Sequence, residues 1–99
     1  MSNEISYVLD DDGLGFHARH HDISIGMITF VRVGIDKLVI DHTEIHTDYA
    51  DQNIDAELVK CVVNLARDQH RKIMCMCPIA RAVFNRTPEY DDIRLIHMH

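Results

Sequence analysis

The fold is decided by residues 54–80, which read IDAELVKCVVNLARDQHRKIMCMCPIA. Apolar residues in the first part recur at the spacing of an amphipathic helix: Ile54, Leu58, Cys61, Val62, Leu65 and Ala66. Acidic residues stand at the start of this helix and basic residues at its end, as the helix dipole favours. The apolar run Ile73–Cys77 then predicts a buried strand, which Pro78 ends.

Alternating apolar residues upstream of the helix predict four strands, over Ile5–Leu9, Leu14–Ala18, Ile23–Val33 and Leu38–Ile45. Turn-forming residues separate them at 10–13, 20–22 and 34–37. In the third strand Gly26 predicts a bulge, and one face is expected to carry Ile23, Ile25, Met27, Thr29, Val31 and Val33. In the fourth strand, one face is expected to carry Leu38, Ile40, His42 and Glu44.

Downstream of Pro78, the segment Ile79–Phe84 predicts a short helix, and Leu95 with Ile96 suggests a final strand or a loose tail. A strand, a helix and a strand in succession join parallel neighbours through a right-handed crossover. We therefore expect an α/β fold with a mixed sheet, in which antiparallel N-terminal strands precede a strand–helix–strand crossover and a short C-terminal helix. The length of 99 residues fits one domain over residues 1–99.

The composition argues against several classes of partner. Lys+Arg total 10 and Asp+Glu total 16, so the net charge of −6 disfavours binding to a nucleic-acid backbone. No apolar run approaches the ~20 residues that span a bilayer, and the N-terminus lacks the features of a signal peptide. Three cysteines cannot form a closed disulfide framework. We expect a cytoplasmic protein with no membrane partner, and the sequence leaves its oligomeric state open.

Four ordered stretches carry a resemblance to a known family. They are Ile40–Ile45, Gln52–Ile54 leading into Leu58-Val59, Cys77–Ala80 and Thr87–Ile93. Together they resemble the small single-domain branch of the GNAT superfamily of N-acetyltransferases, and the likeness covers residues 23–93. The resemblance implies a GNAT-like fold, in which the fourth and fifth strands splay apart to admit acetyl-CoA. It also implies transfer of an acetyl group to a primary amine on a small molecule or a protein.

The resemblance also implies the site residues. His42 and Cys77 match the active-site histidine and cysteine of the small branch, where imidazole takes a proton and a thiolate accepts the acetyl group. Pantetheine is expected to pair with the end of the fourth strand, and the pyrophosphate to rest on the loop over 50–56 that opens the helix. The implied cofactor-binding residues are Glu44, Ile45, His46, Thr47, Gln52, Asn53, Ile54, Asp55 and Ala56.

This loop departs from the family pattern. Ala50 stands where arginine is common, and Asp51, Asn53 and Asp55 stand where glycine is common. A carboxylate ~6 Å from a phosphate charge costs about 3 kcal/mol at an effective dielectric constant of ~20. Attraction of a phosphate to a helix N-terminus contributes only ~0.3–2 kcal/mol, which is smaller than this repulsion. We therefore expect acetyl-CoA to bind weakly. A structural interpretation is also open, because Asp and Asn are common where helices begin.

Other interpretations remain open beside the enzyme. His42 could be a hydrogen-bonded core histidine, and Cys77 a small buried apolar residue like Cys61 and Cys75. The chain could be a non-catalytic descendant that keeps the fold as a binding or assembly module. Imidazoles could also bind a metal, although no spacing matches a structural zinc site; the candidate histidines are His17, His20, His21, His97 and His99. We therefore assign no residue as a metal ligand.

Overall fold

The computed structural model describes residues 5–95, and these form one six-stranded sheet with the order β1-β2-β3-β4-β5-β6. The strands are β1 (Ser6–Leu9), β2 (Gly15–His20), β3 (Ile23–Val33), β4 (Lys37–Ile45), β5 (Lys72–Cys75) and β6 (Arg94–Leu95). The helices are α1 (Ile54–Asp68) and α2 (Pro78–Asn85), with the 3₁₀ turns η1 (Thr47–Tyr49) and η2 (Pro88–Ile93).

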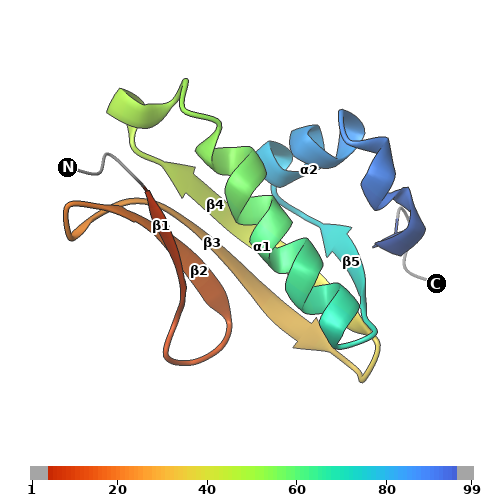
Figure 1. Cartoon of the computed structure of the whole chain (residues 1–99). Helices are drawn as coiled ribbons and strands as arrows, with labels where there is room; N and C mark the ends of the chain where they lie inside the picture. Colours follow the sequence, from red (N-terminus) through yellow and green to blue (C-terminus); the bar gives the residue numbers. More distant parts are fainter. Residues whose placement is uncertain (1–4, 96–99) are drawn as a thin grey trace.

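The sheet is mixed, as the sequence predicts. β1 to β4 pair antiparallel with their neighbours, whereas β4–β5 and β5–β6 are parallel pairs. α1 provides the crossover between the two central parallel strands β4 and β5 (Figure 1). The predicted fold class is confirmed, and the short C-terminal helix is α2.

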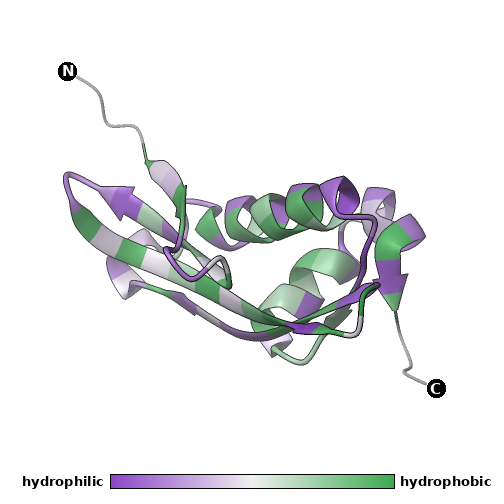
Figure 2. Ribbon diagram, turned by 90° about the horizontal axis from the view of Figure 1, so that it is seen from below, coloured by the Kyte–Doolittle hydropathy of each residue, from purple (hydrophilic) through white to green (hydrophobic). Residues whose placement is uncertain are grey.

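Both helices lie over the same face of the sheet and pack against each other (Figure 2). Between the helices and the sheet lies one hydrophobic core, built around Phe30, Leu38, Leu58, Ile73 and Phe84. The other face of the sheet has no helix against it within residues 5–95, and Val31 and Val33 are exposed there. The molecule is therefore a two-layer structure with one covered and one open sheet face.

A bulge in β3 changes which residues face the core. Ala18 pairs with Gly26 but Arg19 pairs with Ser24, so Ile25 is the extra residue, beside the glycine that predicts the bulge. Ile25 is buried, whereas Met27, Val31 and Val33 lie with Thr29 on the open face. The expectation that all six odd-numbered residues share one face is therefore wrong. The core residues of β3 are Ile25, Gly26, Ile28 and Phe30.

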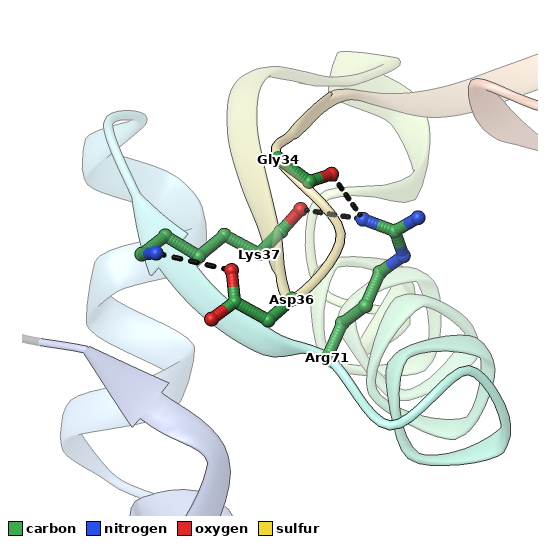
Figure 3. Close-up of polar contacts among 4 residues, drawn as sticks. All are labelled: Gly34, Asp36, Lys37 and Arg71. Atoms are coloured by element: carbon green, nitrogen blue, oxygen red, sulfur yellow. Dashed lines mark hydrogen bonds and ion pairs between the residues drawn. The ribbon is translucent and has the colours of Figure 1, made fainter.

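Arg71 links the entry of β5 to the β3–β4 turn, at the end of the molecule away from the start of α1. Its guanidinium Nη1 donates to the carbonyl oxygens of Gly34 and Lys37, at 3.1 and 3.2 Å (Figure 3). In the same turn, Lys37 Nζ contacts Asp36 Oδ1 at 3.1 Å. The entry to β5 is therefore fixed to the β3–β4 turn, which sets the register of the parallel pair.

Most predicted elements are present, with small shifts at their ends. β5 is shorter than the predicted Ile73–Cys77 because the chain leaves the sheet after Cys75 to begin α2. The sequence analysis missed both 3₁₀ turns. Ile96, half of the suggested final strand, lies outside the described residues. Within residues 5–95, no helix combines the length and apolar character that crossing a membrane requires.

Candidate functional site

The candidate site lies where β4 and β5 diverge. Their parallel pairing runs from Lys37↔Lys72 to Ile40↔Cys75, and the Met76 amide donates to the Ile40 carbonyl at 2.9 Å. Beyond this point β4 continues to Ile45, while the chain after β5 turns away into α2 (Figure 1). The second half of β4 therefore has no strand pairing on its β5 side, as the GNAT resemblance implies.

A bulge in β4 separates the two predicted catalytic residues. Phe30 pairs with Ile40 but Thr29 pairs with His42, so Asp41 is the extra residue. His42 consequently lies on the open face, 57% exposed, with its Nε2 3.3 Å from Glu44 Oε2. The expectation that His42 and Glu44 share a face with Leu38 and Ile40 is wrong, and His42 is not a core histidine.

Thr43 takes the core-facing position that the sequence pattern assigned to His42. It is the one buried polar residue among those described, and its hydroxyl makes no ordinary hydrogen bond there. Its backbone amide and hydroxyl both face the thiol of Cys77. The structure thus brings Cys77 together with Thr43 rather than with His42.

The Cys77 thiol sits at the start of α2, where backbone amides converge on its sulfur. Cys77 is the N-cap residue, Pro78 is the first helical residue, and the Arg81 amide donates to the Cys77 carbonyl at 2.9 Å. Burial alone would raise the pKa of the Cys77 thiol. That effect is outweighed by the Ala80 amide, the Thr43 hydroxyl and the Ile79 and Thr43 amides, which together lower the pKa. Donor groups that face the sulfur in this way favour the thiolate over the neutral thiol.

The other two cysteines are chemically different. Burial raises the pKa of the Cys75 thiol to about 11, and the nearby guanidinium groups of Arg94 and Arg81 only partly offset it. Burial and the charge of Glu57 also raise the pKa of Cys61. Cys75 is buried, as expected for a core residue, whereas Cys61 is half-buried. Of the three thiols, only Cys77 has an environment that favours a nucleophile.

The residues expected to bind pantetheine occupy the end of β4 and the turn after it. Glu44, His46 and Thr47 are exposed and Ile45 is half-buried. The His46 amide donates to the Ile25 carbonyl at 2.8 Å, so β3 fixes this end of β4 on one side only. These positions leave backbone groups on the β5 side for an extended ligand.

The loop before α1 contains one residue, Asn53, in a left-handed backbone conformation. Asn53, the N-cap of α1, is left-handed with φ 62°, a conformation that glycine and asparagine adopt most readily. Gln52 and Asn53 are exposed, whereas Ile54 is buried against Gly26. The Ile54 side chain is therefore an anchor for α1, and only its backbone is available to a ligand.

Asp55 already occupies part of this helix start. Its Oδ1 accepts from the Ala56 amide at 2.9 Å, and its Oδ2 lies 3.0 Å from Nη2 of Arg86 at the end of α2. One of the two loop carboxylates behind the expected repulsion is thus paired with a cation. Sequence reasoning missed Arg86, because a contact across 31 positions leaves no local pattern.

The histidine clusters do not form a metal centre in the part of the chain that is described. Residues 5–95 contain no group of three or more His, Cys, Asp or Glu side chains that could hold a metal ion. His17 contacts Asp10, and His20 Nδ1 lies 2.7 Å from the Tyr49 hydroxyl, so these rings point to different partners. His97 and His99 lie outside the described residues.

Comparisons with known proteins agree with this geometry. A family model described as GCN5-related N-acetyl-transferase matches residues 15–93. A GCN5-like protein from Staphylococcus aureus is similar in structure, with a TM-score of 0.74 and 28% sequence identity over 100% of this chain and 95% of its own. A search of curated proteins gave no match.

Two larger solved structures share the fold. A ribosomal-protein-alanine N-acetyltransferase from Brucella melitensis has a TM-score of 0.62 and 19% identity, covering 86% of this chain and 63% of its own. Ard1 from Thermoplasma volcanium has a TM-score of 0.58 and 11% identity, covering 62% of this chain and 41% of its own. At these identities the likeness is one of fold alone.

Proposed function

Because the chain belongs to the GCN5-related N-acetyltransferase family, we propose that it transfers the acetyl group of acetyl-CoA to a primary amine. The acceptor is a small molecule or an exposed amine of a protein. The observation that carries this proposal is the Cys77 thiol, which lies at the divergence of β4 and β5 among donors that lower its pKa. We also propose a cytoplasmic location, where free thiols persist.

The residues present fit the thioester end of acetyl-CoA. The unpaired side of β4 beyond Ile40 offers backbone groups to an extended pantetheine arm. Acetyl-CoA supplies an activated acyl group, and Cys77 accepts it through its sulfur while the coenzyme thiolate leaves. The amides of Thr43 and Ala80 stabilise the Cys77 thiolate before attack and again when the amine displaces it.

His42 has a separate role on the other side of the sheet. Its exposed ring lies on the open face with Glu44 as its partner, whereas Cys77 lies on the helical side. An amine that approaches the strand gap from the open face would meet His42 before it meets the thiol. We propose that His42 takes the proton of the attacking amine and that Glu44 orients the ring.

Intact-protein mass spectrometry after incubation with acetyl-CoA tests the thiol step. The wild-type protein should gain one acetyl group, which hydroxylamine should remove because it is a thioester. Cys77→Ser should not gain a hydroxylamine-sensitive group, whereas Cys75→Ser should still do so. Unchanged labelling of Cys77→Ser would refute Cys77 as the acceptor, and loss in both variants with native melting curves would refute the assignment to one thiol.

A further inference from the structure

The loop that should hold the diphosphate of acetyl-CoA lacks a cation of its own. No lysine or arginine occurs between positions 38 and 59, and Asp48, Asp51 and Asp55 lie within that interval. The coenzyme brings several negative charges, so its binding requires positive charge from another element. A role for that element in coenzyme binding rests on the proposed function.

Arg86 is the basic residue that reaches this helix start. It caps the C-terminal end of α2, and its Nη2 lies 3.0 Å from Oδ2 of Asp55 in the first turn of α1. The Asp55 side chain is 27% exposed and that of Arg86 is 50% exposed. The pair is therefore open to solvent on one side, and a competing anion can reach it.

The other arginines near the two helices are engaged elsewhere, whereas Lys60 is exposed on α1. Arg67 pairs with Asp92 at 2.8 Å, and Arg81 donates to the Cys75 carbonyl at 3.3 Å. Arg71 holds the β3–β4 turn, and the Arg94 guanidinium lies 5.7 Å from the centre of the Phe84 ring. Arg86 is thus the arginine whose contact is with the loop itself.

The carboxylate of Asp55 occupies the position that we expect a bound anion to take. One of its oxygens accepts the Ala56 amide at 2.9 Å while the other meets the guanidinium of Arg86. An amide of a helix start together with an arginine is a donor set suited to a phosphate oxygen. The carboxylate is covalently tethered, so it competes with any incoming phosphate for both donors.

We propose that Arg86 is the diphosphate-binding residue of this protein, and that Asp55 is a resident carboxylate which the coenzyme must displace. The positive charge that the loop lacks is thus supplied by the second helix. Asp55 lowers the affinity in two ways: it occupies the donors, and it repels the phosphates at close range. The remaining loop charges, Asp48 and Asp51, are not paired with lysine or arginine within residues 5–95.

Calorimetric titration of five variants with two ligands tests this proposal. The ligands are CoA and pantetheine, which lacks the phosphates and, like CoA, carries no acetyl group. Arg86→Gln should weaken CoA binding about tenfold or more, the range expected for losing a charged hydrogen bond. Asp55→Asn keeps an oxygen for the Ala56 amide but loses the charge, and it should strengthen CoA binding about tenfold. Neither change should alter pantetheine binding more than about twofold.

Two matched controls carry the same charge changes far from the loop. Arg32→Gln lies on β3 opposite Leu38, and Asp68→Asn lies at the last residue of α1. Both residues are exposed, and both variants should bind CoA within about twofold of the wild type. A double variant, Asp55→Asn with Arg86→Gln, should lose the gain of the single Asp55 change.

The outcomes separate the inference from the function on which it rests. If neither ligand binds the wild type, the proposed function fails, and the inference fails with it. If CoA binds but Arg86→Gln leaves its affinity unchanged, the role of Arg86 is wrong while the acetyltransferase proposal stands. If Asp55→Asn weakens CoA binding, the carboxylate assists the ligand instead of competing with it, and that half of the proposal is overturned.

Discussion

Cys75 and Cys77 allow a test of thiol chemistry in two residues of similar overall exposure. They are 7% and 6% exposed, so neither residue is freely open to a small alkylating reagent. Their pKa values are shifted in opposite directions: that of Cys75 is raised to about 11, and that of Cys77 is lowered. The pH at which each residue begins to react therefore reports its thiolate fraction, because a fixed difference in access does not move that pH.

The size of the difference follows from the two pKa values. At neutral pH a thiol at the ordinary value of 9.0 carries roughly 100 times more thiolate than one at about 11. The less basic thiolate is also a weaker nucleophile, by about tenfold over this range. At equal access, Cys77 should therefore react at least about tenfold faster than Cys75, and any lowering below the ordinary value widens the gap.

The assay is site-resolved mass spectrometry of iodoacetamide labelling across a pH series. Thr43→Val removes the hydroxyl that faces the sulfur, so it should shift the Cys77 profile to higher pH. Thr29→Val, on the open face of β3, should leave that profile unchanged. Equal rates at Cys75 and Cys77, or a Cys77 profile indifferent to Thr43→Val, would refute the reasoning that hydrogen-bond donors outweigh burial at this thiol.

Two further predictions concern stability. A Cβ at Gly15 would lie 2.7 Å from the Ile28 carbonyl oxygen and 2.7 Å from Asp10 Oδ2. Gly15→Ala should therefore lower the free energy of unfolding by about 1–3 kcal/mol, measured by urea titration. An unchanged urea midpoint would contradict this close packing. The raised pKa of Cys75 stabilises the fold below the unfolded pKa of 9.0, and this contribution, up to about 3 kcal/mol, should be lost as pH rises toward about 11. Cys75→Val should show a shallower decline over that pH window, and an identical slope would exclude this thiol as a cause.

The parts of the fold that depend on local periodicity could be predicted from the sequence. The stripe from Ile54 to Ala66 places α1 correctly, and alternation places β3 over its observed bounds. The strand–helix–strand order gives the parallel pair without any long-range information. The end of the strand before Pro78 was also predicted, but Cys77 was placed on that strand, whereas it is the N-cap residue of α2.

The orientation of His42 and Thr43 could not be predicted, because the bulge in β4 reverses it. Each bulge adds one residue, and one residue exchanges the two faces of a strand. Nothing in the residues around Asp41 indicates a bulge. The alternation of Leu38, Ile40 and His42 therefore predicts one shared face, although the bulge places His42 on the other face. The contact of Asp55 with Arg86 was inaccessible for another reason, since it depends on how α2 packs against α1.

The extra residue in β4 also bears on how this protein tolerates changes in chain length. Deletion of Asp41 would restore a regular ladder and keep every later pairing, with His42 opposite Thr29 on the open face and Thr43 opposite Ile28 on the core face. A residue inserted beside Asp41 has no such position to occupy, and it would exchange the two faces of the rest of β4. Natural variants of this strand are therefore expected to include forms that lack the bulged residue, and none that carry one more residue here.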